Sequence, residues 1–433
     1  MDSMASTVNP PRGMRDFLPA EKARRERVLG VIRGSYRAHG FDEIETPVME
    51  DSSRLHAGLG GDNEKLAFAV MKRGLTADKL QAASEALDLA DLGLRFDLTV
   101  PLARFYATHR AELPKVFRAI QIAPVWRAER PQKGRYRQFV QCDIDIMGEA
   151  GPSAEIELLT ATAATLDALG IEGCTIRVND RRLLSSVLTI LGFPTKEHEA
   201  VLITIDKLDK IGADGVVAEL RERAFPNAPV AALAEFLNRP QPETTPEFTV
   251  DAIRAALPDG VNEAIISDLA AIGHAVESGR GTAGALIEFD PWLVRGMGYY
   301  TGAIFEVAHP SLGYSLGGGG RYDGMIGRFL GSDVPAVGFS LGFERLVDLV
   351  ELGDAAHDDQ LALIYDADVD PTVLIRLQAE LIRDGNRVRL EARPRKLPQL
   401  LDQLKAAGFT SFATVRADVD GVASLDFKVL DQQ

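Results

Sequence analysis

The sequence predicts an α+β fold, with a helical segment in the middle of the chain and a small α/β domain at its end. Two segments, 92–101 and 137–147, alternate polar and apolar residues as strands do. Residues 181–278 are rich in apolar residues at helical spacing instead. After residue 360, "LALIYDAD", a helical stretch at 371–384, "RVRLEA", a helical stretch at 397–407 and "TSFATV" alternate strand and helix.

Composition is that of an ordinary globular protein. The 433 residues are 46% hydrophobic and 26% charged, with a formal net charge of −15. The N-terminus lacks an apolar core and no apolar run reaches about 18 residues, so we expect neither a secretory signal nor a membrane span. The two cysteines are outside any CxxC pair and fit a reducing cytoplasm. An acidic chain repels polyanions, so nucleic acid would bind only to local basic patches.

The first predicted element is an amphipathic helix over 17–39. Val28, Ile32 and Tyr36 recur at intervals of four, and Gly40 follows as a stop signal. The next segment, "FDEIETPVME", is typical of a strand interrupted by Pro47. A proline there favours a sheet edge or an interface over a central strand.

The stretch "LGLRFDLTVP" predicts a strand whose two faces differ in polarity. Arg95, Asp97 and Thr99 fall on one face, and apolar residues fall on the other. A carboxylate on the polar face could accept hydrogen bonds from an ammonium group or an imidazole. The same residues would also suit a sheet face in contact with solvent.

Residues 117–147 predict an antiparallel hairpin with a basic loop. On its second strand, Phe139, Gln141, Asp143 and Asp145 share the polar face. Five basic residues lie in and beside the loop: Arg127, Arg130, Lys133, Arg135 and Arg137. Guanidinium groups bind phosphate oxygens in bidentate fashion, and Phe139 could stack on a base. A solvated arginine-rich turn is the alternative.

Residues 292–346 add glycine-rich and strand-like segments. Glycines 317–320 would allow close approach to a ligand, a sharp turn or a flexible hairpin tip, and no GK[ST] follows to make a Walker loop. Arg295 before Tyr299 and Tyr300 is hard to explain by packing, because buried tyrosine hydroxyls need partners. "PAVGFSLGFERL" predicts a strand, a glycine and a helix that carries Arg345.

The order of these segments resembles histidyl-tRNA synthetases, members of the class II aminoacyl-tRNA synthetases, over nearly the whole chain. The first helix with "IETP" resembles the first class II motif, whose proline lies at the dimer interface. Residues 117–148 resemble the second motif and "VGFSLGFERL" the third. "RGMGYYTG" and "GGRYDGM" are similar to two signatures of the histidine enzymes.

The resemblance implies a class II antiparallel sheet flanked by helices. The catalytic domain would comprise 1–180 and 255–352, with a helical insertion at 181–254 and a shortened C-terminal α/β anticodon-binding domain at 358–433. The implied activity is that of a cytoplasmic, homodimeric histidine–tRNA ligase without a membrane partner. ATP, with Mg²⁺ on its phosphate oxygens, would convert L-histidine to histidyl-adenylate, and the histidyl group would pass to tRNA(His) with release of AMP and diphosphate.

The resemblance also implies roles for individual residues. The ATP site would comprise Arg127 at the α-phosphate, Arg135 towards the β/γ end, Glu129, and Phe139 and Arg345 on the two faces of adenine. The histidine site would comprise Asp97, Thr99 and Gln141 around the α-amino group, Asp145 and Tyr300 at the imidazole, Tyr299, Tyr322, and Arg295 at the carboxylate. Arg127 and Arg295 would be catalytic, and Gln132, Lys133 and Gly134 would meet the acceptor end of tRNA. The sequence assigns no ligand to Mg²⁺.

The sequence departs from the commonest family pattern at a few positions. Gly298 stands where many relatives have Asp, and Asp97 and Asp145 stand where bacterial relatives often have Glu. An alternative is the regulatory paralogue that partners ATP phosphoribosyltransferase in histidine synthesis, which usually loses the ATP-binding arginines and the C-terminal domain. Retention of Arg127, Arg295, Arg345 and the C-terminal domain favours the enzyme, and "RGMGYYTG" conflicts with a class II enzyme for another amino acid.

Overall fold

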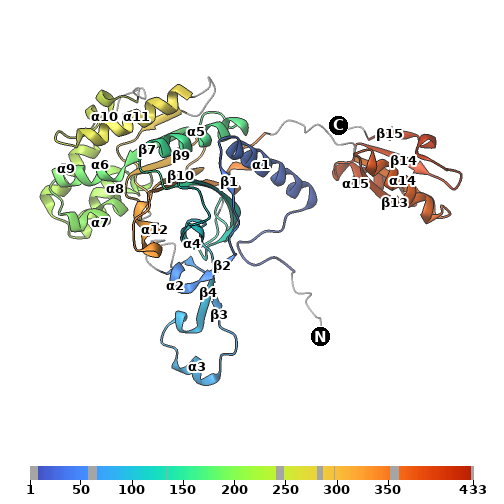
Figure 1. Ribbon diagram of the computed structural model, residues 1–433, viewed down its shortest axis with the longest axis horizontal. Helices are drawn as coiled ribbons and strands as arrows, with labels where there is room; N and C mark the ends of the chain where they lie inside the picture. Colours follow the sequence, from blue (N-terminus) through green and yellow to red (C-terminus); the bar gives the residue numbers. More distant parts are fainter. Residues whose placement is uncertain are drawn as a thin grey trace. The chain divides into compact units, whose positions relative to one another are not determined.

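The computed structural model describes residues 8–56, 66–132, 134–239, 248–279, 286–296, 298–351 and 360–430 (Figure 1). The chain divides into two compact units, one of Met1–Arg15 with Leu29–Glu351 and the other of Asp16–Val28 with Leu352–Gln433. In its described part, the first unit holds an eight-stranded and a three-stranded sheet, and the second holds a four-stranded sheet. The predicted α+β fold with a C-terminal α/β domain is confirmed.

The eight-stranded sheet is mainly antiparallel. Its strands, in spatial order, are β1 (Asp42–Glu43), β5 (Phe117–Trp126), β6 (Gln138–Met147), β11 (Ala336–Gly342), β10 (Gly317–Arg321), β9 (Ala303–Ala308), β7 (Thr175–Asp180) and β8 (Leu286–Phe289). Only the outer pairs, β1 with β5 and β7 with β8, are parallel among these strands. The predicted hairpin is β5 with β6, in register from Phe117 opposite Met147 to Trp126 opposite Gln138.

Helices cover both faces of this sheet. They are α1 (Pro19–Ala38), α4 (Thr99–His109), α5 (Ser153–Ala168), α11 (Glu263–Gly279), α12 (Asp323–Leu330) and the single turn α13 (Phe343–Leu346). Figure 1 shows α5 and α11 on one face and α4 and α12 on the other. The predicted first helix is confirmed: Ile32 and Tyr36 are fully buried, and Gly40 follows its end with φ of +82°.

The predicted helical segment forms α6 (Arg181–Ile190), α7 (His198–Ile205), α8 (Leu208–Glu222), α9 (Asn227–Leu237) and α10 (Val250–Ala255). Its core, which includes Leu188, Leu202 and Leu220, continues onto Val294 and onto Ile304 of β9. These helices therefore pack directly against the segment that carries Arg295. Most of the predicted polar connection at 238–248, residues 240–247, lies outside the described residues.

The predicted strand at 92–101 is wrong beyond its first residues. Strand β4 (Ala90–Leu94) ends early and joins β2 (Met49–Asp51) and β3 (Ala69–Met71) in the order β2-β4-β3. Asp97 Oδ1 accepts a hydrogen bond from the Val100 backbone N–H at 3.2 Å, which favours a helix start, and α4 begins at Thr99. Arg95 does not join Asp97 in lining the cavity; its guanidinium donates instead to the carbonyls of Thr46 and Pro124.

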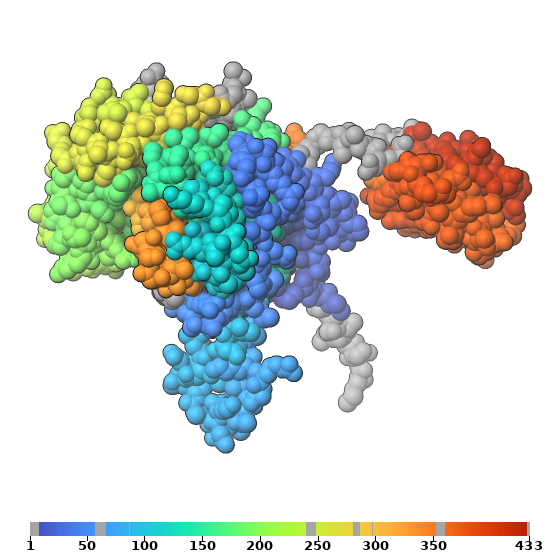
Figure 2. All heavy atoms as spheres, in the orientation of Figure 1, coloured from blue at the N-terminus to red at the C-terminus, as the bar shows by residue number. Residues whose placement is uncertain are grey.

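The three-stranded sheet lies at one end of the first unit with two short helices, α2 (Ser52–Leu55) and α3 (Ala77–Ala82). The part with β3 and α3 projects from the body of this unit (Figure 2). Several large apolar side chains are exposed here: Val48, Met49, Met71, Leu80 and Leu92. The chain between β1 and β2 contains Pro47, so the predicted interruption of the strand is confirmed.

The second unit contains β12 (Gln360–Tyr365), α14 (Pro371–Arg383), β13 (Arg387–Ala392), α15 (Leu397–Ala406), β14 (Ser411–Val415) and β15 (Phe427–Val429). The strand order is β13-β12-β14-β15, parallel except for β15. Leu361 and Leu363 of β12 pack with α14, whereas Ala362 and Ile364 pack with α15, so one helix covers each face. No helix in the described ranges of the chain is both long and apolar enough to cross a bilayer.

Candidate functional site

A cavity of about 350 Å³ lies in the first unit over strands β6, β11 and β10. Fourteen of the sixteen residues singled out from the sequence line it: Asp97, Thr99, Arg127, Glu129, Gly134, Arg135, Phe139, Gln141, Asp145, Arg295, Tyr299, Tyr300, Tyr322 and Arg345. Gln132 is instead in a shallower depression with Gly13 and Arg15, and Lys133 lies outside the described residues. The chain thus gathers residues from distant segments into one pocket.

Strand β6 supplies one wall of the cavity through its alternation of faces. Phe139, Gln141, Asp143 and Asp145 line the cavity, whereas the intervening Cys142, Ile144 and Ile146 are fully buried. Gln141, Asp143 and Asp145 are each less than a tenth exposed. The polar face of this strand is therefore enclosed in a pocket and is not a solvated sheet surface.

Buried carboxylates mark one end of the cavity. The Tyr322 hydroxyl donates to Asp145 Oδ1 at 2.5 Å, yet burial raises the pKa of Asp145 to about 7. Burial and the neighbouring Asp145 raise the pKa of Asp143 well above its usual value. Two close carboxyl groups with raised pKa values would gain from a cation or a hydrogen-bond donor placed between them.

Two buried polar atoms in this part of the cavity lack a hydrogen-bond partner among the described residues. Gln141 Nε2 donates to Ser340 Oγ at 2.9 Å, but Gln141 Oε1 and Asp143 Oδ1 are buried without a hydrogen bond to any described residue. The amide oxygen of Gln141 only accepts hydrogen bonds, and Asp143 Oδ1 does the same when that carboxyl group is ionised. Buried acceptors facing a cavity suit a ligand that donates several hydrogen bonds, such as an ammonium group.

Three tyrosines close the same end. The ring of Tyr299 lies 4.7 Å from that of Tyr300 and 6.2 Å from that of Tyr322, measured between centroids. Burial raises the pKa of all three hydroxyls, so each remains a neutral donor at physiological pH. The cavity end thus combines flat aromatic faces with both donors and acceptors.

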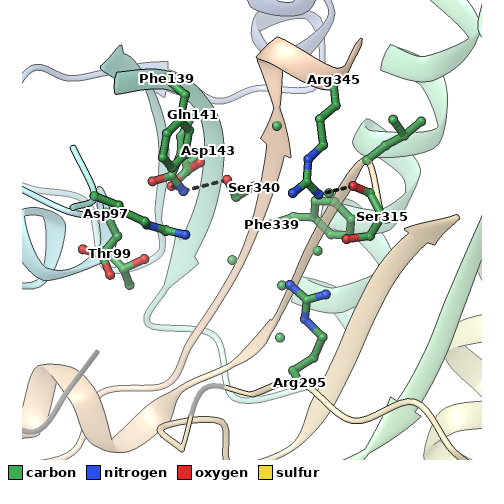
Figure 3. A pocket seen from close by; sticks show the side chains of 18 of the residues that line it. Asp97, Thr99, Phe139, Gln141, Asp143, Arg295, Ser315, Phe339, Ser340 and Arg345 are labelled. Carbon is green, nitrogen blue, oxygen red and sulfur yellow. Dashed lines mark hydrogen bonds between the residues drawn. The ribbon is translucent and has the colours of Figure 1, made fainter. Parts of the chain in front are cut away.

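Four arginines also line the cavity, and Figure 3 shows Arg295 and Arg345 across it from Asp97 and Asp143. Arg127 Nε donates to the Phe96 carbonyl at 3.0 Å, and its guanidinium lies 5.1 Å from the centroid of the Phe139 ring. Arg295 Nη1 donates to Glu306 Oε2 at 2.5 Å. Burial lowers the pKa of Arg127, and Asp97 and Glu129 oppose that effect. Guanidinium groups keep their charge even so, and they would attract phosphate or carboxylate groups.

Arg345 and Arg135 line the cavity beside the loop of the basic hairpin. Arg345 Nη1 donates to the Ser315 carbonyl at 2.5 Å, and its guanidinium lies 5.0 Å from the centroid of the Tyr314 ring. Arg135 is within 3.6 Å of Glu129, a partly exposed pair that contributes little to stability. Figure 3 shows Arg345 and Phe139 on opposite sides of the cavity.

A strand of glycines forms the floor of the cavity. Gly317 to Gly320 belong to β10, which pairs with β9 on one side and β11 on the other. An ideal Cβ at Gly318 would lie 2.6 Å from Arg295 Cζ, and one at Gly320 would lie 2.9 Å from a ring carbon of Tyr300. The expected turn or hairpin tip is wrong, because these glycines form a paired central strand. Close approach to a ligand stays a prediction; the side chains of Arg295 and Tyr300 already approach the backbone closely.

Several cavity residues were not singled out from the sequence as site residues. Asp143 shares its strand face with Gln141 and Asp145, so the alternation of faces was the signal that could have found it. Ser340 lies opposite Asp143 across the β6–β11 pairing, which sequence spacing does not reveal. Tyr314 does not line the cavity but lies beside Arg345, which does, and no sequence signal marks it.

Comparison with known proteins identifies the family. A family model described as histidyl-tRNA synthetase matches residues 13–346. The histidine–tRNA ligase of Leifsonia xyli subsp. xyli is 62% identical over 435 residues, which cover 99% of this chain and 100% of that protein. The probable histidine–tRNA ligase of Tropheryma whipplei (strain Twist) is 46% identical, with 94% and 95% covered.

The structure agrees with these sequence matches. The crystal structure of histidyl-tRNA synthetase from Nostoc sp. PCC 7120 superposes with a TM-score of 0.75 at 25% identity, covering 98% of this chain and 94% of that one. Both the sequence and the fold are thus shared along almost the whole chain. The chain belongs to the histidyl-tRNA synthetase family.

Proposed function

We propose that the protein is a histidine–tRNA ligase, which activates L-histidine with ATP and transfers the histidyl group to tRNA(His). The observation that supports this most strongly is the cavity, which joins a cluster of arginines to a cluster of buried carboxylates and tyrosines. An anionic nucleotide suits the first end, and an amino acid with donors on its ammonium and imidazole groups suits the second.

ATP would lie along the basic hairpin. Phe139 and Arg345 face each other across the cavity, so adenine would stack on the ring and meet the guanidinium on its other face. Arg127 would hold the α-phosphate and Arg135, with Glu129 beside it, would reach the β/γ end. Arg127 and Arg295 are the groups we expect to touch the reacting atoms.

Histidine would lie over the glycine floor. Gln141 Oε1, Thr99 and Asp97 would surround the α-amino group, Arg295 would bind the carboxylate, and Asp145 and Tyr300 would contact the imidazole. Tyr299 and Tyr322 would enclose the ring. Tyr322 already donates to Asp145, which orients the carboxylate oxygens and leaves Oδ2 for an imidazole N–H.

Activation needs positioning and charge stabilisation rather than a protein nucleophile. A carboxylate oxygen of histidine attacks the α-phosphorus, the bond to the bridging oxygen breaks, and diphosphate leaves with the negative charge. Arg127 and Arg295 would stabilise the charge that develops on the α-phosphoryl oxygens. In the second step, a terminal ribose hydroxyl of tRNA attacks the carbonyl carbon, and AMP leaves.

ATP would enter as its Mg²⁺ complex. No group of three or more acidic, histidine or cysteine side chains suited to a metal lies together in the described part of the chain. Mg²⁺ commonly relies on phosphate oxygens, water and one or two carboxylates, so one carboxylate beside the phosphates would be enough to contact it. Glu129, which lines the cavity at the basic end, is the carboxylate best placed for such a contact.

The remaining parts would serve assembly and RNA binding. We assign the catalytic domain to 1–180 and 255–352, the helical insertion to 181–254 and anticodon binding to the C-terminal domain at 358–433. Gln132, Lys133 and Gly134 would meet the acceptor end of tRNA. Two copies would pair through the exposed apolar side chains near Pro47, such as Val48 and Met49, because a contiguous apolar surface favours association.

We place the enzyme in the cytoplasm, where buried Cys142 and Cys174 would stay reduced. The alternative, an inactive regulatory subunit of ATP phosphoribosyltransferase, is less well supported, because such a subunit usually loses the arginines that bind ATP. Arg127, Arg295 and Arg345 all line the cavity. High identity to curated ligases over the full chain also favours the enzyme.

Amino-acid-dependent ATP–diphosphate exchange across the twenty amino acids tests this function. We expect exchange with histidine alone, followed by charging of tRNA(His) when the RNA is added. Absence of histidine-dependent exchange in well-folded protein would contradict the ligase function and favour the regulatory subunit.

A further inference from the structure

Arg177 lies outside the cavity but is linked to Arg295 through a single carboxylate. It is not among the residues that line the cavity, and its side chain is 23% exposed. Arg177 Nη2 donates to Glu306 Oε1, and Arg295 Nη1 donates to Glu306 Oε2. Each carboxylate oxygen of Glu306 therefore accepts a hydrogen bond from one arginine.

The sheet registers keep these groups in one row. Arg177 of β7 lies directly opposite Glu306 of β9, and Glu306 lies directly opposite Gly318 of β10. The guanidinium of Arg295 lies over Gly318, where no side chain can obstruct it. Side chains opposite each other on neighbouring strands share a face, so backbone pairing sets Arg177, Glu306 and Gly318 in one row. Arg295 reaches this row from the connection between β8 and β9.

The charges in this row explain why two arginines share one carboxylate. Without Arg177, the full negative charge of Glu306 would offset the positive charge of Arg295, the guanidinium that has to attract the substrate. Arg177 takes up part of that charge, so Arg295 is held in place yet stays positive towards the cavity. Burial lowers the pKa of Arg177, but Asp290 and Glu306 more than offset this, so Arg177 stays charged.

Two further carboxylates hold Arg177 with unequal strength. Asp290 Oδ2 accepts from Arg177 Nη1 at 3.1 Å, and the Asp290 side chain is 16% exposed. Asp209 of α8 accepts from Nη2 at 3.3 Å but is 73% exposed, so solvent screens its contribution. Asp290 is therefore the main anchor, and loss of Asp209 would have little effect.

We propose that Arg177 is a positioning residue for amino-acid activation, acting through Glu306 to fix Arg295 over Gly318 and to preserve its positive charge towards the substrate carboxylate. This inference rests on the proposed function, in which Arg295 binds that carboxylate. Arg177 itself touches neither substrate nor the reacting atoms.

The test measures histidine-dependent ATP–diphosphate exchange in Arg177→Ala, Arg177→Lys and the double variant Arg177→Ala/Glu306→Gln. We expect Arg177→Ala to lower kcat on the order of 10-fold or more, because misplacement of a catalytic group by about 1 Å costs up to 10²-fold. The KM for ATP should change less than kcat. Lysine, which keeps the charge, should restore part of the activity.

The double variant distinguishes a role of Arg177 in balancing the charge of Glu306 from a merely structural role. If Arg177 acts by balancing Glu306, then neutralising Glu306 should raise kcat above that of Arg177→Ala. A merely structural role predicts a double variant at least as poor as the single one. Arg118→Ala is the matched control: Arg118 of β5 pairs with Glu157 at 2.6 Å and is 31% exposed, but it lies outside the cavity, so exchange should be unchanged.

Binding of histidine and of histidinol, which lacks the carboxylate, provides a readout without turnover. Arg177→Ala should weaken histidine binding more than histidinol binding, and Arg177→Gln serves if the alanine variant does not fold. Kinetics within threefold of wild type, no recovery in the double variant, or equal loss for both ligands would overturn the inference. Absence of exchange in the wild type would contradict the proposed function instead, while the binding comparison would still test Arg177.

Discussion

A methyl group at Gly318 tests the glycine floor and the placement of Arg295 together. An ideal Cβ there would lie 2.6 Å from Arg295 Cζ, 2.7 Å from Nη2 and 2.8 Å from Nη1. Non-bonded carbons are comfortable at about 3.5 Å, so Gly318→Ala must displace the guanidinium by ~0.9 Å. The obstructed atoms are the end of a flexible side chain, so the fold should accommodate the change.

The expected result is a large loss of catalysis with little loss of stability. A displacement near 1 Å at a group that positions the reacting atoms costs on the order of 10²-fold in rate. Replacing a strand glycine by alanine contributes roughly 0.5–1 kcal/mol of favourable backbone entropy, which offsets local strain. The thermal unfolding midpoint should therefore stay near that of wild type.

The assay is histidine-dependent ATP–diphosphate exchange, with kcat and KM measured separately. Gly324→Ala is the matched control, because an ideal Cβ at that position meets nothing within 4 Å. The reasoning would be refuted if Gly318→Ala retained exchange within threefold of wild type. A loss of exchange accompanied by unfolding would assign the glycine to stability and not to the placement of Arg295.

Three further predictions follow from the site. Arg295→Ala should lower kcat for histidine activation on the order of 10²-fold or more while leaving the fold intact, as checked by circular dichroism; activity within threefold would contradict its role. Because burial raises the pKa of Asp145 to about 7 and the ionised form accepts the imidazole N–H, kcat/KM should rise between about pH 6 and 8. Asp145→Asn should remove that rise, and an unchanged pH profile would mean that another group reads the imidazole. Deletion of residues 355–433 should spare exchange but sharply weaken tRNA charging, because the basic stretch 383–396 is removed; a fragment that charges tRNA as well as the full chain would reject an RNA-binding role.

The part of the site that lies on one strand could be predicted from the sequence. Along β6, alternation alone separates Gln141 and Asp145, which line the cavity, from Cys142 and Ile144, which are buried. The rule holds there because both neighbours of β6 pair with it along most of its length. Composition and motif order likewise sufficed for the α+β fold and for the C-terminal α/β unit.

The alternation of polar and apolar residues gave a wrong prediction where the backbone changes from strand to helix. Residues 92–101 alternate as regularly as β6, but the strand ends at Leu94 and a helix begins at Thr99. Asp97 still reaches the cavity, because it lies at the start of that helix, while Arg95 turns away to buried carbonyls. Alternation of polar and apolar residues cannot tell a long strand from a short strand that is followed at once by the start of a helix.

Contacts between distant segments were beyond sequence reasoning. The place of Ser340 beside Asp143 depends on the pairing of β11 with β6, and the glycines form a central strand only because β9 and β11 flank them. Four glycines have low strand propensity, so tertiary pairing overrides the local preference. Glu306 and Arg177 were missed for the same reason.

The pairing of β6 with β11 also has a consequence for how the protein is made. These strands are separated in sequence by residues 148–335, so on the ribosome β6 emerges long before its partner exists. Until then the β5–β6 hairpin presents an unpaired edge, which is prone to associate with other chains. The pocket is completed only when Arg345 has left the exit tunnel, whereas residues 360–430 emerge afterwards and are not among the residues that line it. Truncated chains that stop before residue 336 lack β11 and should therefore aggregate more readily than longer ones. Pausing of translation after the whole pocket has emerged should have the least effect on folding of the catalytic unit.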